Sequence, residues 1–165
     1  MVTNTKLKGL YQPEFEKDSC GFGLIANIDD MPSHWLISTS IAALARLTHR
    51  GAMAADGKSG DGCGLLLKKP DSFLRSKADE LGISCAEQYA VGMQFMSPHA
   101  GETEESQSIT EQKVAEQGLQ FAGWREVPTD PSACGEEALK SKPAIYQAYI
   151  NAPDEMPLAE FERSL

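Results

Sequence analysis

One cysteine in this chain stands in a setting that could make it a nucleophile. Cys20 follows a polar leader, Met1–Ser19, and opens the run Cys-Gly-Phe-Gly-Leu-Ile-Ala. If the chain were cut before Cys20, this residue would carry both a thiol and a free α-amine. With a pKa of about 8, that amine could take the thiol proton and later return it to a leaving group. An uncleaved Cys20 would instead be a small buried hydrophobic residue, which is the commoner role of a free cysteine.

Two glycine patterns resemble nucleotide-binding motifs but lack the context that those motifs need. Gly21–Ala26 matches G-x-G-x-x-A, yet the polar residues before it cannot form the buried strand that this fingerprint requires. Gly57-Lys-Ser ends like a phosphate-binding loop, but Ala52 stands where the required earlier glycine would be. We therefore predict no nucleotide site. Gly21 and Gly23 would instead let a substrate backbone approach the neighbouring sulfur closely.

The cysteine pattern favours free thiols in a reducing compartment. The four cysteines are Cys20, Cys63, Cys85 and Cys134, and no two of them form a C-x-x-C pair. Without that spacing or a His-x-x-x-His partner, a zinc site has little support. The leader also lacks the apolar segment of an export signal. We expect a cytoplasmic location, with the last three cysteines serving as packing residues.

The length and charge of the chain limit its class and its partners. Its 165 residues suffice for one domain or part of one, and its 41% apolar and 24% charged residues are typical of globular proteins. The net charge is −9. So acidic a chain repels phosphate backbones and anionic lipid, which argues against nucleic acid and membranes as partners. The apolar runs are too short to span a bilayer.

Hydrophobic periodicity predicts the elements that must position Cys20. The first helix would begin at an N-cap, Ser33, and stop near Gly51, and the glycine-rich stretch 51–64 would then form an irregular loop. The alternation of strand and helix indicates a layered α/β or α+β domain. Strands are expected at Cys20–Ile28, 65–67, Tyr89–Met96, Phe121–Val127 and Ala144–Ile150, and further helices at 70–82, Glu102–Gln120 and Glu136–Lys140, with another starting within Pro157–Leu165.

Several motifs together resemble one known family. They are Asp18-Ser-Cys-Gly-Phe-Gly-Leu-Ile-Ala26, Ala43-Leu-Ala-Arg-Leu-Thr-His-Arg-Gly-Ala52 and Ala55-Asp-Gly-Lys-Ser-Gly-Asp-Gly-Cys-Gly-Leu65, extended by Tyr89–Met93 and Gly123–Thr129. In this order and spacing they resemble the class II glutamine amidotransferase domain at the start of the bacterial glutamate synthase large chain. The resemblance implies an α+β architecture, the four-layer αββα N-terminal-nucleophile hydrolase fold, which we expect to be incomplete at the C-terminus.

The resemblance also implies a reaction. Residues 1–19 would be a propeptide, and residues 20–165 the N-terminal part of the amidotransferase domain. Cys20 would attack the carboxamide of glutamine, release ammonia and form a thioester that water hydrolyses to glutamate. In the complete enzyme the ammonia would meet 2-oxoglutarate at a second site, and FMN would reduce the imine with electrons from NADPH or ferredoxin through iron–sulfur clusters. We expect none of these cofactors within this chain. A small reductase chain is an implied partner.

The same resemblance implies that Gly21, Arg50, Gly51 and Asp61 support the substrate site. Arg50 would position the cysteine terminus or the adjacent loop through its rigid donor fork. Alternatively, Arg50 binds the last carbonyls of a helix that Gly51 caps. Asp61 lies in an Asp-Gly turn, which is its default role, although the family places this loop near the active site. His49 is expected to be structural, because the α-amine already serves as the base.

Two later motifs of the family are absent from the 165 residues. These are His-Asn-Gly-Glu, which supplies the oxyanion hole, and Arg-Phe-Ser-Thr, which helps to hold the glutamine α-carboxylate. We therefore expect a truncated chain that is inactive by itself. The alternative to a glutaminase portion of glutamate synthase is a non-catalytic fragment that at most docks to other chains. The sequence does not choose between NADPH and ferredoxin and gives no oligomeric state.

Overall fold

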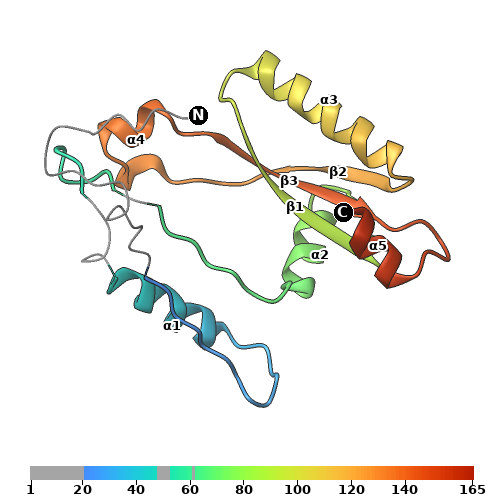
Figure 1. Cartoon of the computed structure of the whole chain (residues 1–165), viewed down its shortest axis with the longest axis horizontal. Helices are drawn as coiled ribbons and strands as arrows, with labels where there is room; N and C mark the ends of the chain where they lie inside the picture. Colours follow the sequence, from blue (N-terminus) through green and yellow to red (C-terminus); the bar gives the residue numbers. More distant parts are fainter. Residues whose placement is uncertain (1–20, 48–52, 61) are drawn as a thin grey trace, which may run out of the picture. The chain divides into compact units, whose positions relative to one another are not determined.

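A computed structural model describes residues 21–47, 53–60 and 62–165 of the chain. The chain divides into two compact units, Met1–Leu65 and Leu66–Leu165 (Figure 1). All the large buried hydrophobic side chains of the described residues belong to the second unit.

The second unit is built on a three-stranded antiparallel sheet. Its strands are β1 (Tyr89–Met96), β2 (Gln120–Glu126) and β3 (Ala144–Asn151), in the order β1-β3-β2 (Figure 1). The central strand β3 pairs with β1 along its whole length and with β2 across a bulge between Phe121 and Gly123. The expected β1 is confirmed to the residue, and the expected β2 and β3 to within one residue at each end.

Helices pack on both faces of this sheet because side chains alternate along the strands. On one face, Tyr89 and Tyr149 form a core with Leu74 and Ala78 of α2 (Asp71–Asp79). The other face packs against α3 (Ala100–Glu116) and α5 (Leu158–Ser164). Its core contains Val114, Leu119, Ala152 and Phe161, with Ala90, Phe121 and Ile150 beside them. The expected α+β class is therefore confirmed, with an antiparallel sheet.

Helix α3 begins two residues before and ends four residues before the expected Glu102–Gln120, because Gly118, with a φ of +72°, stops the helix. The other helices of this unit lie close to their expected positions. The short helix α4 (Glu136–Lys140) is confirmed to the residue, after a 3₁₀ turn η3 (Pro131–Ala133). Helix α3 has only two buried residues, Thr103 and Val114, as expected of a solvated outer helix. Gly82 ends α2 with a φ of +70°, and the amide of Ile83 donates to the carbonyl of Ala78 at 2.9 Å. This is the glycine helix end that the sequence indicates.

A bulge glycine on β2 is required by close packing. A Cβ added at Gly123 would lie 2.8 Å from Cγ1 of Ile83 and 3.0 Å from its Cδ1. Ile83 is itself buried in the core on the α2 side of the sheet. A residue with a side chain at position 123 would therefore clash with a side chain that has little room to move.

The described residues of the first unit contain one helix and little buried surface. Helix α1 (His34–Ala45) starts after Ser33, which is extended as expected of an N-cap but makes no side-chain capping bond. The helix ends at Ala45, earlier than expected. None of its residues is buried, and the Trp35 side chain is 68% exposed.

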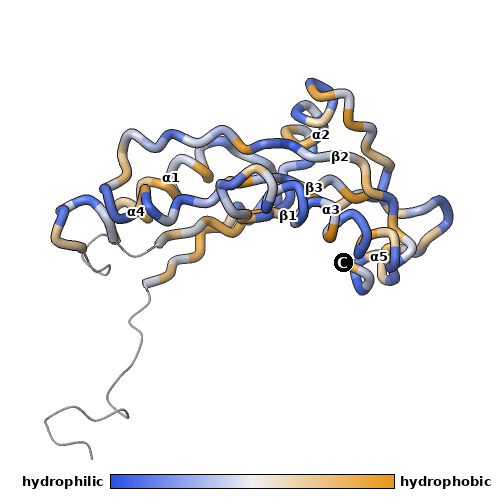
Figure 2. The backbone as a smooth tube through the Cα atoms, turned by 90° about the horizontal axis from the view of Figure 1, so that it is seen from above, coloured by the Kyte–Doolittle hydropathy of each residue, from blue (hydrophilic) through white to orange (hydrophobic). Residues whose placement is uncertain are grey.

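Among the described residues before α2, two strands that the sequence predicts are not formed. Residues 21–27 have no regular structure, with Phe22 94% and Leu24 91% exposed, and the 65–67 segment is also irregular and open. Figure 2 shows the first of these runs as a mostly orange stretch that begins where the grey trace ends. A strand is stable only when a neighbouring strand binds its backbone. Among the described residues, none pairs with either segment.

Candidate functional site

Of the five residues that the sequence assigns to the site, the structure describes one. Gly21 is exposed and lies in the irregular run at the start of the described chain. Cys20, Arg50, Gly51 and Asp61 lie outside the described residues, as does His49. A Cβ at the neighbouring Gly23 would meet no atom within 4 Å, so this part of the backbone is open to an approaching ligand. The expected contact with substrate stays a prediction.

The structure describes a closed loop between the Arg50 motif and the Asp61 motif. Met53 and Gly60 form an isolated antiparallel bridge, and the amide of Ala54 donates to the carbonyl of Ser59 at 2.8 Å. At the tip, the Gly57 amide donates to the carbonyl of Ala54 at 3.0 Å, and Gly57 has a φ of +68°. The glycine-rich stretch therefore contains an ordered turn.

One carboxylate, that of Asp56, organises this turn. Its Oδ1 accepts hydrogen bonds from the amides of Lys58 at 3.0 Å and Ser59 at 2.7 Å, and its Oδ2 accepts one from the Ser59 hydroxyl. Ser59 is only 8% exposed. The amides that a phosphate-binding loop would present are thus engaged by a negatively charged group, which agrees with the absence of a phosphate loop in the sequence. Sequence reasoning missed Asp56, although Asp followed by Gly-Lys-Ser is an Asx-turn signal.

The described cysteines differ from one another in burial. Cys85 packs beside Tyr89 and Tyr149 as expected, and burial raises the pKa of its thiol. A raised pKa keeps the thiol protonated and makes Cys85 a poor nucleophile. Cys134 is half-buried. Cys63 is exposed, so its expected packing role is wrong, because it lies in a segment without a core.

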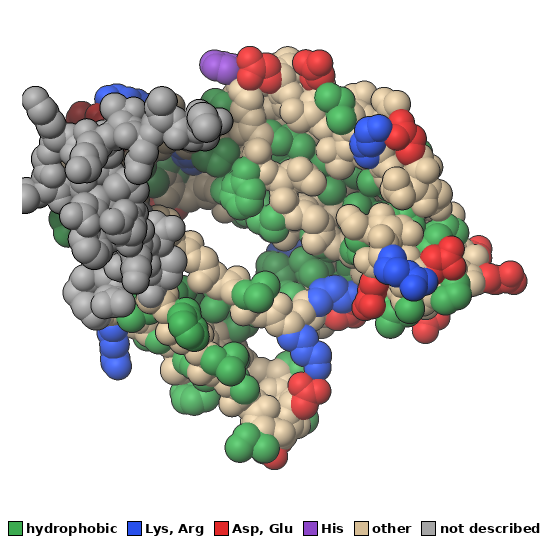
Figure 3. Space-filling model, in the orientation of Figure 1, with side chains coloured by type: hydrophobic (Ala, Val, Ile, Leu, Met, Phe, Trp, Pro, Cys, Tyr) green, Lys and Arg blue, Asp and Glu red, His purple; other side chains and the backbone are tan. Residues whose placement is uncertain are grey.

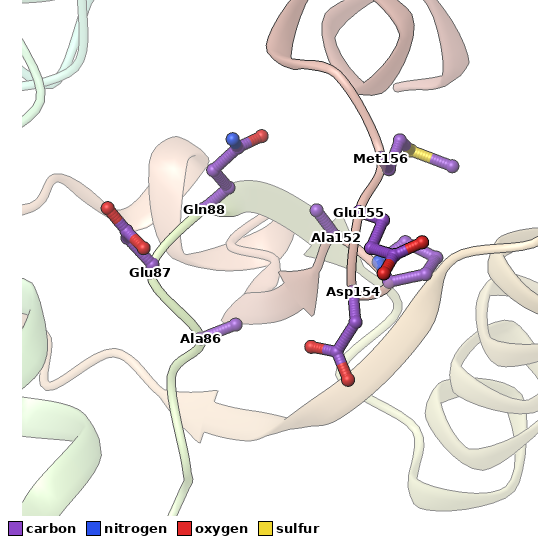
Figure 4. A pocket seen from close by; sticks show the side chains of 8 residues that line it. Ala86, Glu87, Gln88, Ala152, Asp154, Glu155 and Met156 are labelled. Carbon is purple, nitrogen blue, oxygen red and sulfur yellow. The ribbon is translucent and has the colours of Figure 1, made fainter.

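A cavity of about 330 Å³ in the second unit does not suit glutamine. It lies between residues Ala86–Gln88 and Ala152–Met156 (Figure 4). The side chains of Glu87, Asp154 and Glu155 line it, and no Lys or Arg does. The α-carboxylate of an amino-acid substrate would meet only like charge there. We therefore do not place the glutamine site in this cavity.

The described residues show no metal centre and no membrane span. Across residues 21–47, 53–60 and 62–165, no three His, Cys, Asp or Glu side chains are grouped to hold a metal ion. No helix in the same ranges is long and apolar enough to cross a bilayer. Acidic and basic side chains are interspersed on the face in Figure 3. Among the described residues, ion pairs join Arg75 to Asp71 and Lys77 to Glu80.

Comparison with known proteins finds similarity to one family along nearly the whole chain. The sequence model for glutamine amidotransferases class-II matches residues 20–165. The chain is 35% identical to the glutamate synthase (NADPH) large chain of Bacillus subtilis over 161 residues, which are 97% of this chain and 11% of that protein. It is 36% identical to the glutamate synthase (NADH) of Schizosaccharomyces pombe, over 88% of this chain and 7% of that protein. It is 34% identical to the ferredoxin-dependent glutamate synthase 1 of Arabidopsis thaliana, over 91% and 9% respectively. The chain thus spans at most 11% of the length of these three relatives.

Proposed function

The chain belongs to the class II glutamine amidotransferases, and from this premise we propose that it supplies part of the glutaminase site of a glutamate synthase. The observation that carries the proposal is the family match over residues 20–165, which begins at the cysteine that the sequence singles out. Similarity to NADPH-, NADH- and ferredoxin-named glutamate synthases supports the same conclusion.

In the proposed reaction, the leader Met1–Ser19 is removed and Cys20 becomes the first residue. Its α-amine accepts the thiol proton, and the sulfur attacks the carboxamide carbon of glutamine. The amine then returns the proton to the leaving nitrogen, which departs as ammonia and leaves a γ-glutamyl thioester. Water, deprotonated by the same amine, attacks the thioester, and glutamate leaves as the thiol reforms. No residue other than Cys20 is needed as nucleophile, and no metal takes part.

We propose that the three-stranded sheet is one of two stacked sheets in a four-layer αββα domain. The support is an apolar stretch on the α2 side of the sheet. Met93 and Phe95 lie on the same face of β1 as Tyr89, and their side chains are 48% and 67% exposed. Ile145 lies opposite Phe95 and is half-buried. Large apolar side chains gathered on a sheet face favour a second apolar layer over it.

The redox groups belong to the rest of the longer protein in this proposal. The described residues offer no cluster of metal-binding side chains, and the Gly57-Lys-Ser turn uses its amides on Asp56. The proposal assigns no iron–sulfur cluster, FMN or nicotinamide dinucleotide to these residues. We place those groups, the 2-oxoglutarate site and the small reductase chain outside the 165 residues. The relatives carry different reductants in their names, so the choice between NADPH and ferredoxin stays open.

The test is glutamine-dependent glutamate synthesis by the complete gene product that carries this chain. Cys20→Ala should abolish it, because no thioester can form, while synthesis from free ammonia should survive at least in part. Cys63→Ala is the matched control, because this exposed thiol has no role in the proposal. Glutamine-dependent rates that are equal in Cys20→Ala and wild type would refute the assignment.

A non-catalytic fragment is the second candidate, and one observation favours it for the chain in isolation. The described residues of the first unit, which adjoin Cys20, bury no large hydrophobic side chain. We expect Cys20–Leu165 alone to be a negligible glutaminase, because the His-Asn-Gly-Glu motif that supplies the family's oxyanion hole is not among these residues. The loss of one oxyanion-hole donor already costs about 10²–10³ in rate. Glutamate release by this segment at the rate of the complete gene product would eliminate the second candidate.

A further inference from the structure

The face of the sheet that packs on α2 carries a positive charge outside the part that α2 covers. Side chains of β1, β3 and β2 form rows across this face, and the row centred on Tyr149 packs against α2 and Ile83. The next row consists of Met93, Gln147 and Arg125. Beyond that row, Phe95 pairs with Ile145, and the Phe95 side chain is 67% exposed. The charge therefore lies between the covered part of this face and an open apolar part.

Arg125 is held on this face by its neighbour across the ladder. Its Nη1 donates to Oε1 of Gln147 at 2.8 Å. The adjacent Trp124 points to the opposite face, where its indole donates to Glu111 of α3 at 2.7 Å. Gln147 accepts one of the five N–H groups that a guanidinium offers. No carboxylate of the described residues forms an ion pair with Arg125, which is half-buried.

A purely apolar layer over this row would conflict with that charge. The four-layer domain of the proposed function puts a second apolar layer over Met93 and Phe95, and Arg125 lies in the same row as Met93. The layer would thus remove the guanidinium from water. Burial of a charge without a counter-charge is so costly that buried charges in proteins are almost always paired.

We infer that the layer over this face belongs to the same gene product and carries a carboxylate that pairs with Arg125. The inference rests on the proposed function, which supplies the layer. A carboxylate can accept two parallel N–H bonds from a guanidinium, and Gln147 already fixes the orientation of this one. The chain spans at most 11% of the length of its three compared relatives, so a longer polypeptide of this kind can supply the layer without a second copy.

Labelling of a cysteine on the open part of the face measures the cover in the complete gene product. The thiol of Phe95→Cys is treated with a maleimide, and peptide mapping follows its modification separately from that of the native cysteines. A covered thiol reacts only when the layer opens, so it should label about 10²-fold more slowly in the native protein than in urea. Labelling at the urea rate would overturn the inference, because the face would then be open.

Arg125→Met, combined with Phe95→Cys, separates a layer that carries a carboxylate from a layer that is apolar throughout. Methionine keeps an apolar side chain at this position but has no charge. If a carboxylate faces Arg125, the substitution leaves it buried and unpaired, and labelling should become about 10²–10³-fold faster. Over an apolar layer, the loss of the charge would stabilise the cover instead. Labelling that is unchanged or slower would therefore overturn the inference. Glu126→Met is the matched control, because Glu126 is exposed on the opposite face, and it should leave the rate unchanged.

Arg125→Lys provides a second measurement, which also serves if Arg125→Met does not fold. A carbodiimide couples a lysine amine to a carboxylate in contact with it, so that an amide forms and the carbodiimide takes up the water. We expect a cross-link from residue 125 to an Asp or Glu of the same polypeptide. Mixed preparations with light and heavy nitrogen distinguish this cross-link from one between two copies, which would overturn the inference.

The proposed function fails in a different way. Its failure would appear as a wild-type protein without glutaminase activity, or with activity that survives Cys20→Ala. A Cys20-dependent glutaminase in which Phe95→Cys labels at the urea rate, or in which Arg125→Met does not speed labelling, would leave the glutaminase assignment standing and remove only this inference.

Discussion

Replacing Gly123 by alanine should destabilise the second unit, chiefly through a clash with the side chain of Ile83. The new Cβ would stand 2.8 Å from Cγ1 and 3.0 Å from Cδ1 of Ile83, closer than carbon atoms tolerate. Ile83 is 8% exposed and packed in the core on the α2 side, so it cannot swing away freely. Overpacking of this kind costs about 1–3 kcal/mol. Gly123 also has a φ of +158°, which residues with a side chain rarely adopt, so alanine gains nothing from its lower unfolded-state entropy there. We expect a net loss of about 1–3 kcal/mol in the free energy of unfolding.

The loss is measured by urea unfolding of the chain, followed through tryptophan fluorescence. Trp124 neighbours Gly123 on β2 and reports directly on the sheet. With a slope of about 1–3 kcal/mol per molar urea, the midpoint should fall by about 1 M. Gly92→Ala on β1 is the matched control, because its nearest neighbour, Nε2 of Gln94, would be 3.8 Å away. We expect no loss for that variant.

A double-mutant cycle tests the stated cause. Ile83→Ala removes the atoms that a Cβ at position 123 would meet, although it opens a cavity of its own. If the clash is the cause, the double variant should lose less stability than the two single variants together, by about 0.5–3 kcal/mol. Additive losses, or equal midpoints for Gly123→Ala and Gly92→Ala, would refute the steric explanation.

Three further predictions concern Arg75, its partner Asp71 and the leader Met1–Ser19. Arg75 donates to the three carbonyls of residues 85–87 at 3.1–3.3 Å, and a lysine ammonium cannot span them. Arg75→Lys should therefore lower the free energy of unfolding by about 1–3 kcal/mol. Urea titration measures this loss, and an unchanged midpoint would contradict the prediction. Hydrogen bonding to Arg75 lowers the pKa of Asp71, so this contribution to stability is present above the ordinary pKa and fades as the pH falls through the lowered one. Thermal unfolding at neutral pH and near pH 3 (about one unit below the ordinary carboxyl pKa) should therefore show a smaller acid loss in Asp71→Asn than in wild type, and equal losses would exclude the linkage. Intact-mass measurement of the active gene product should show Cys20 as its first residue, and full activity in protein that retains Ser19 would refute processing.

The sequence predicts the second unit well because its signals are local. Side chains along β1 and β3 point alternately to the two faces of the sheet, and residues 66–165 supply a core on each face. Tyr149, on the α2 side, is fully buried. Helix α2 ends at a glycine whose positive φ the sequence anticipates. In each case, the feature and the side chains that stabilise it lie in one compact unit.

The first unit is predicted less well because an apolar run does not specify its partner. Cys20–Ile28 has the composition of a buried strand, yet Phe22 and Ile28 are almost fully exposed in the structure. Strand pairing depends on residues far away in the sequence, which periodicity does not identify. Motifs identify the family and point to Cys20, but they do not single out Asp56, because its signal, an Asx turn, is common in loops.

The position of β3 has a consequence for the order in which this protein folds. β1 and β2 do not pair with each other, and both depend on a central strand that is made after them. Tyr89, for instance, pairs with Asn151. Met96 pairs with Ala144 at the other end of the ladder, so a ribosome must release the chain beyond residue 144 before pairing can begin and beyond residue 151 before either ladder is complete. Pairing over such distances is slow. Until then β1 and β2 expose unpaired edges, so the nascent chain is most vulnerable to aggregation in the interval before β3 emerges.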